Sequence, residues 1–158
     1  MPIDETARVR IVLPAPAIAP QAANALTVAL SKLFAQFIRE KRCAQCELRR
    51  EHDGAAYLIA WAPDVDLSGC SHDKIHAVLA AHEQDGQRLL DTPPLVVRVD
   101  GRWQGCTRRD LRALLAAGRV GPTTDCIDTS CRTLGEWRQR GITALGAHPV
   151  APVLWPVG

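Results

Sequence analysis

The sequence predicts an α+β fold, and three observations indicate it. Alternation of apolar and polar residues predicts several short strands, and apolar residues at three- and four-residue steps predict helices. Turn pairs such as Asp53-Gly54 separate neighbouring strands. Up to residue 99 the predicted order is strand, helix, strand, strand, helix, strand. This order predicts a ferredoxin-like split βαβ core, in which two helices lie on one face of an antiparallel sheet.

The first strand is predicted at residues 8–13, where apolar side chains alternate. The proline-rich segment 14–20 ends this strand, and Pro20 suits the first turn of a helix because that turn does not use its missing N–H group. We expect the helix to continue to about Arg42. Its apolar face consists of Leu26, Leu30, Leu33, Phe34, Phe37 and Ile38.

A hairpin is predicted next, with strands at residues 43–51 and 55–62. The second of these strands carries no charged residue, so we expect both of its faces to be covered, or one face to meet a partner. Tyr57 and Trp61 share one face of this strand and are therefore candidate residues for binding a protein partner.

A second helix is predicted at residues 71–84 and a fourth strand at residues 95–99. We assign residues 1–99 to the ferredoxin-like core and residues 100–158 to a small C-terminal α/β extension. The extension is expected to add a hairpin strand, a helix over residues 108–117 and an extended tail. We expect all of it to pack on the core as a single compact domain.

The composition is that of an ordinary globular chain of 158 residues with a net charge of +2. This small charge gives no indication of nucleic-acid binding. The N-terminus has acidic residues where a signal peptide has basic ones, and no apolar run approaches the ~18 residues of a membrane helix. We therefore expect a cytoplasmic protein with reduced cysteines and no membrane contact.

A glycine-containing turn before the second helix is the strongest candidate for a chemical site. Ser71 is the expected N-cap, and Asp73 is expected in the first helical turn. Cys70 would then lie beside free backbone N–H groups, which stabilise a thiolate. The alternative is a structural turn in which a small cysteine fills space. The catalytic candidates are Cys70, Ser68, Ser71 and Asp73, with Gly69 as a binding candidate.

The pair Cys43 and Cys46 has the CxxC spacing of a zinc or redox site. Both residues are predicted at the start of a strand, where positions three apart point to opposite faces. This geometry does not favour either function. A structural zinc site is kept as an alternative, with Cys43, Cys46, Cys126 and Cys131 as its ligands. Apart from this alternative, the sequence predicts no metal and no cofactor.

Three arginines, Arg108, Arg109 and Arg112, form a basic stripe on the predicted third helix. Such a stripe is either a solvated face or a site for phosphate or for an acidic partner. The chain has no Walker loop, no GxGxxG and no GxSxG motif. This argues against nucleotide hydrolases, Rossmann enzymes and α/β-hydrolases.

Five segments follow one another in a characteristic order: Ala7-Arg8-Val9, Ala56 to Ala60, Ser68-Gly69-Cys70-Ser71-His72-Asp73, Leu111 to Val120, and Thr123-Thr124-Asp125. In this order they resemble a family of uncharacterised bacterial proteins that are sometimes labelled as ABC transporter ATPases, although they lack any ATPase motif. The Ser-Gly-Cys-Ser-x-Asp hexapeptide at a helix start is the specific signature. The family usually has an aliphatic residue at the position of His72, and the other five cysteines are not part of its pattern. The resemblance implies no known activity but directs attention to Cys70.

The preferred hypothesis is therefore a thiol-centred catalytic or redox site at Cys70, acting on an unknown small molecule or protein. Whether the protein is an enzyme stays open. One alternative is a non-catalytic module for protein binding or oligomerisation, including a homodimer. The other is a zinc-stabilised module.

Overall fold

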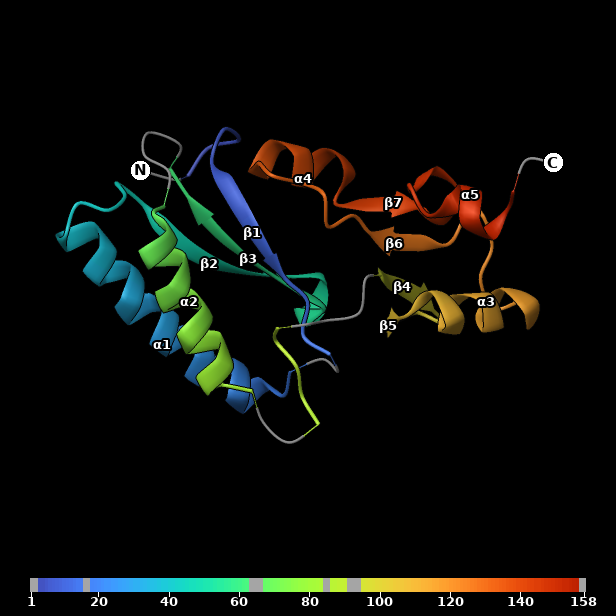
Figure 1. Cartoon of the computed structure of the whole chain (residues 1–158), viewed down its shortest axis with the longest axis horizontal. Helices are drawn as coiled ribbons and strands as arrows, with labels where there is room; N and C mark the ends of the chain where they lie inside the picture. The colour runs from blue at the N-terminus through green and yellow to red at the C-terminus, as the bar shows by residue number, and fades with distance from the viewer. Residues whose placement is uncertain (1–2, 16–17, 63–66, 84–85, 91–94, 157–158) are drawn as a thin grey trace.

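The structure is a computed structural model that describes residues 3–15, 18–62, 67–83, 86–90 and 95–156 (Figure 1). It is a mixed α+β fold with two antiparallel sheets, which confirms the predicted fold class. The first sheet has the order β1-β3-β2 and contains β1 (Arg8–Val12), β2 (Cys46–Glu51) and β3 (Ala56–Trp61). The second sheet has the order β5-β4-β6-β7 and contains β4 (Leu95–Val99), β5 (Arg102–Cys106), β6 (Asp125–Ile127) and β7 (Ile142–Ala144).

Helices occur between these strands and after the last of them. The α-helices of the described residues are α1 (Pro20–Arg39), α2 (Gly69–Ala81), α3 (Arg108–Ala116), α4 (Leu134–Arg140) and α5 (Ala151–Leu154). Two short 3-10 helices, η1 (His52–Gly54) and η2 (Leu145–Ala147), complete the secondary structure. No helix in these described segments is long and apolar enough to cross a membrane.

The long helix α1 forms as the sequence predicts, with a proline in its first turn and an apolar face toward the sheet. Its buried residues are Ala23, Leu26, Leu30, Phe34 and Phe37. Ile38 was expected on the same face but is 43% exposed, because only Phe37 of the last turn reaches the core. α1 and α2 lie side by side on one face of the first sheet (Figure 1).

The uncharged strand β3 is the central strand of the first sheet, and the chain itself covers both of its faces. On one face, Tyr57, Ile59 and Trp61 pack against α1 and α2. On the other face, Leu58 packs with Trp137 of α4 in a second cluster. The buried faces on both sides explain why the strand needs no polar residue.

The predicted fourth strand, β4, does not join the first sheet, and the ferredoxin-like topology is therefore not confirmed. β4 pairs with β5 and with β6 instead. The free edge of β1 is occupied by the segment before α4, since Val9 N donates to Arg132 O (2.9 Å) and Leu134 N donates to Ala7 O (2.9 Å). An edge whose N–H and C=O groups are already bonded cannot accept another strand.

The second sheet has its own core, in which β4 and α3 contribute Val97 and Leu111. The start of α3 has a capping box, because Thr107 Oγ1 accepts from Asp110 N and an Asp110 carboxylate oxygen accepts from Thr107 N. The C-terminal segment was expected to be extended but contains β7, η2 and α5. It folds because β7 pairs with β6, and Leu145 N continues the contact by donating to Thr124 O (2.7 Å).

Candidate functional site

The first turn of α2 contains the candidate thiol and begins two residues earlier than predicted. Ser68, not Ser71, is the N-cap, and its Oγ accepts from Ser71 N (3.2 Å). Gly69 is the first helical residue, and a Cβ at this position would meet no atom within 4 Å. Asp73 is therefore outside the first turn, where it was expected. Its side chain is exposed.

Ser71 is fully buried and links the start of α2 to the end of α1. Its hydroxyl lies 3.0 Å from Ser68 Oγ and accepts from Arg42 Nη1 (3.2 Å). The Arg42 guanidinium also pairs with Glu40 (2.6 Å) and lies over the Phe37 ring at 5.7 Å. The Ser71 hydroxyl is therefore part of a structural link, and it brings an arginine charge to the helix N-terminus.

Cys70 is exposed on the surface of this turn. In helix geometry the N–H groups of Gly69 and Cys70 have no acceptor within the helix, so they are available to an anion at this position. The neighbouring His72 packs its ring edge-on against Trp61, with ring centres 5.6 Å apart. This contact gives His72 a packing role beside the site.

Tyr57 and Trp61, the predicted binding residues of the first sheet, are 1% and 6% exposed. The helices α1 and α2 cover the face of β3 on which both side chains lie. This coverage agrees with the lack of charged residues in β3. The Tyr57 hydroxyl and the Trp61 indole N–H have no hydrogen-bond partner among the described residues. In the described part of the chain, neither side chain therefore offers a surface to a partner.

The four cysteines of the alternative zinc site are not brought together. Cys43 and Cys46 pack in the core beneath α1 and α2, Cys126 is in the core of the second sheet, and Cys131 is in the cluster between the sheets. Among the residues that the structure describes, no group of three or more His, Cys, Asp or Glu side chains could hold a metal ion. Burial raises the pKa of Cys126 to about 11.

The CxxC pair nevertheless differs from its predicted geometry. β2 begins at Cys46, so Cys43 is in the irregular connection before the strand and does not follow the strand alternation. As a result both side chains pack in the same core cluster.

The arginine stripe of α3 is exposed, as expected for a solvated face: Arg108, Arg109 and Arg112 all face solvent. Arg108 also borders a cavity of about 220 Å³ together with Leu95 and His148. His148 lines a second, wider cavity of about 500 Å³ with Trp155. These cavities lie around the C-terminal segment, which the sequence did not indicate as a site.

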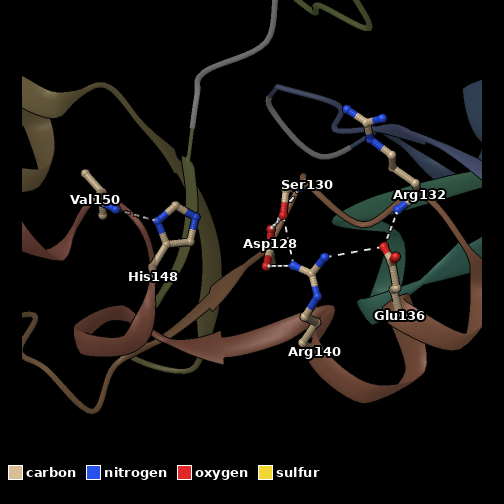
Figure 2. Close-up of polar contacts among 7 residues, drawn as sticks. All are labelled: Asp128, Ser130, Arg132, Glu136, Arg140, His148 and Val150. Atoms are coloured by element: carbon tan, nitrogen blue, oxygen red, sulfur yellow. Dashed lines mark hydrogen bonds and ion pairs between the residues drawn. The ribbon is translucent and has the colours of Figure 1, made fainter.

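The His148 ring has a defined orientation, because it is hydrogen-bonded to the backbone of Val150 (Figure 2). Val150 N donates to His148 Nδ1 (3.1 Å), so the neutral ring carries its proton on Nε2. Burial lowers the pKa of His148 from its usual value, although the negative charge of Asp128 acts in the opposite direction. The ring is therefore a neutral donor at the cavity wall.

A buried carboxylate, Asp128, organises the segment between β6 and α4 (Figure 2). Its Oδ1 accepts from Ser130 N (2.8 Å) and Ser130 Oγ (2.6 Å), and its Oδ2 accepts from Arg140 Nη1 (2.5 Å). Burial raises the pKa of Asp128, but the hydrogen bonds from Ser130 and Arg140 outweigh it, and the pKa is lowered overall. This cluster was not among the predicted sites, although the Asp-x-Ser spacing of an Asx turn was a local signal for it.

No protein-family model, no curated protein and no solved structure matches this chain. The resemblance to the Ser-Gly-Cys-Ser-x-Asp family therefore stays a prediction.

Proposed function

We propose that Cys70 is the nucleophile of a thiol-centred site, catalytic or redox, at the first turn of α2. The observation that carries the proposal is accessibility: Cys70 is exposed, whereas Cys46 is half-buried and the other four cysteines are buried. Cysteine reactivity requires both access and a stabilised thiolate. The substrate is a small molecule or a protein with an electrophilic sulfur or carbon atom that the Cys70 sulfur attacks.

Two features near Cys70 support a thiolate. The α2 dipole places partial positive charge on the N–H groups of Gly69 and Cys70, and α2 has 13 residues, enough for a full terminal dipole. The Arg42 guanidinium reaches the same helix end through Ser71, although Glu40 shares its charge. Ser68 is exposed beside the thiol and supplies a hydroxyl for a bound substrate.

We further infer that α1, α2 and the first sheet act as a ferredoxin-like platform that lacks its fourth strand. Its strand order β1-β3-β2 supports this, because it is the order of a split βαβ unit. The six free cysteines are consistent with a reducing compartment, for which we propose the cytoplasm.

The test compares the alkylation rate of Cys70 in the folded and in the urea-unfolded protein at neutral pH. The tryptic peptide of residues 51–74 contains Cys70 as its one cysteine, so mass spectrometry follows this thiol alone. We expect the folded rate to exceed the unfolded rate by about tenfold or more, because the fold stabilises the thiolate. A folded rate equal to or below the unfolded rate would show an ordinary exposed thiol and would refute the proposal.

The contribution of Arg42 is tested by Arg42→Gln. We expect this variant to lose part of the rate advantage of the folded protein, because one positive charge leaves the helix N-terminus. Arg39→Gln is the matched control, since Arg39 is in the last turn of α1, shortly before Arg42 in the chain, and is exposed. An equal effect of both variants would mean that net charge, rather than the Arg42–Ser71 contact, determines the rate.

A second candidate function is a non-catalytic module that binds an acidic segment of a protein partner. The exposed side chains of Arg108, Arg109 and Arg112, together with the cavity beside Arg108, favour it. Binding of a fluorescent polyglutamate peptide, measured by anisotropy at low salt, should weaken when the three arginines are replaced by glutamine. Unchanged binding in this variant would exclude the α3 face.

A further inference from the structure

The CxxC pair lies where the chain passes from α1 to the edge of the first sheet. α1 ends at Arg39, Lys41 adopts a positive φ of 56°, and Arg42 N donates to Phe37 O (2.8 Å). This reversal turns Cys43 back under the helix, where it is 4% exposed. Cys46 then begins β2 opposite Trp61.

The two cysteines are three residues apart and pack in the same apolar cluster, but they differ in their access to solvent. Cys43 belongs to the buried part of this cluster, and Cys46 packs against it from the start of β2. Cys46 is half-buried at the start of β2, which is an edge strand of the first sheet among the described residues. A small solute can therefore approach the pair from the side of Cys46.

We propose that Cys43 and Cys46 form an oxidisable dithiol, which a peroxide converts into an intramolecular disulfide across the α1–β2 connection. This inference is independent of the proposed function, because it uses neither Cys70 nor its surroundings. It assigns to this chain a second sulfur site whose co-reactant is hydrogen peroxide.

The oxidation proceeds in two balanced steps. One sulfur attacks the peroxide and breaks its O–O bond, which forms a sulfenic acid and releases one water molecule. The second sulfur attacks the sulfenic sulfur, so that the S–S bond forms, the S–O bond breaks and a second water molecule leaves with the remaining thiol proton. Both sulfurs are oxidised, and the peroxide is reduced to water.

The rate of closure depends on pH. Burial raises the pKa of Cys46, as do its contacts with Cys43, and burial also raises the pKa of Cys43. The thiolate is the reactive form, so closure is slow at neutral pH and accelerates as the pH rises. Such a pair stays reduced until the peroxide concentration or the pH increases.

A second cysteine pair in the same chain provides the control. Cys126 and Cys131 are also close in the sequence, but they pack in different clusters, one within the second sheet and the other between the sheets. Each pair falls within a single tryptic peptide, residues 43–49 for the CxxC pair and residues 120–132 for the control. Neither peptide contains a further cysteine.

The experiment treats the full-length folded protein with hydrogen peroxide at increasing pH. The reaction is stopped with acid, and the remaining thiols are then alkylated in denaturant. The masses of the tryptic peptides are measured by mass spectrometry. We expect peptide 43–49 to lose two hydrogen atoms and to carry no alkyl group, while peptide 120–132 carries two. In Cys43→Ser and Cys46→Ser no closure is expected, and each peptide acquires one alkyl group from its remaining thiol.

Two results would overturn the proposal. One is a doubly alkylated peptide 43–49 from the folded protein at every pH, at peroxide concentrations that close the pair in urea. The other is equal closure of both pairs in the folded protein. In urea we expect the difference between the pairs to disappear, because unfolding removes their different environments; a difference that persists would assign the selectivity to spacing and not to the fold. Alkylation of Cys70 does not enter these results, so failure here is distinguishable from failure of the proposed Cys70 site.

Discussion

At the scale of single residues, Asp128 shows how burial and hydrogen bonding combine. Ser130 and Arg140 together donate three hydrogen bonds to its carboxylate, and only 8% of its side chain is exposed. The partner arginine is 44% exposed, so solvent weakens the ion pair. The two hydrogen bonds from Ser130 therefore contribute most of the stabilisation of the Asp128 carboxylate. They hold the segment between β6 and α4 in its turn.

Asp128→Asn tests this account. We expect the variant to lose about 1–3 kcal/mol in free energy of unfolding, because charged hydrogen bonds are replaced by weaker ones at a buried site. Urea unfolding at pH 7 measures this difference. Glu136→Gln is the control: its pair with Arg140 is long, at 3.3 Å, and half-exposed, so a loss under about 1 kcal/mol is expected. Equal losses in both variants would contradict a special role for Asp128.

The same residue gives a pH dependence with a defined sign. Because the pKa of Asp128 is lowered in the folded state from 3.8, its carboxylate contributes stability above that pH. This contribution is lost as the pH falls through 3.8 and then through the folded-state pKa. The stability curves of the native protein and of Asp128→Asn should therefore converge in acid. Parallel curves would mean that the carboxylate is not the titrating group.

At the scale of elements, helix ends depend on close contacts that local sequence does not reveal. α4 ends at Gly141, where a Cβ would lie 2.5 Å from Trp137 O and 2.7 Å from the Trp137 ring. The backbone angle at Gly141 is ordinary, with φ of −58°, so the requirement for glycine is steric and not conformational. At Gly69, the first residue of α2, a Cβ would meet nothing within 4 Å.

Two alanine substitutions separate these situations. Gly141→Ala should cost about 1–3 kcal/mol, because the added methyl group overpacks against buried Trp137. Gly69→Ala should change the free energy of unfolding by less than about 0.5 kcal/mol. Thermal unfolding of both variants measures the contrast. A larger loss of stability in Gly69→Ala than in Gly141→Ala would contradict the finding that a Cβ at Gly69 has free space around it.

At the scale of the whole molecule, β3 joins two apolar layers. Its Tyr57 face packs against α1 and α2, and its Leu58 face packs in the cluster that contains Trp137 and Val96. One strand thus connects the first sheet to α4 and to the second sheet. We expect the two layers that meet at β3 to unfold as one cooperative unit, because neither of them keeps a complete core without β3.

Leu58→Ala tests this arrangement, since Leu58 is fully buried between the layers. The expected loss is about 2–5 kcal/mol, from lost burial and from the cavity that remains. Tryptophan fluorescence and circular dichroism should still report one shared transition in denaturant. Val28→Ala, at a position that is 55% exposed on α1, should change stability by less than about 0.5 kcal/mol. Separate transitions in the native protein would contradict the single unit.

Local features of this chain were predictable because their physics is local. The apolar face of α1, the proline in its first turn and the capping box at Thr107 depend on residues within a few positions of one another. The uncharged composition of β3 predicted a strand with two covered faces, since an apolar side chain in water is unfavourable wherever the strand is placed. The exposed turn at Cys70 was found in the same way, apart from a shift of two residues in the helix start.

The α+β class, the order of elements up to β4 and a turn around Cys70 at the start of α2 follow from the local pattern of residues. The pairing of the strands follows only from the tertiary structure. β4 could complete either sheet by its own pattern, and the segment at Arg132, far away in sequence, already occupies the edge of β1. The packing of Cys43 and Cys46 in one cluster and the hydrogen bond from Arg140 to Asp128 likewise depend on where the chain turns. Such pairings arise from competition among distant segments for the same edges and cores, and local propensity does not encode its outcome.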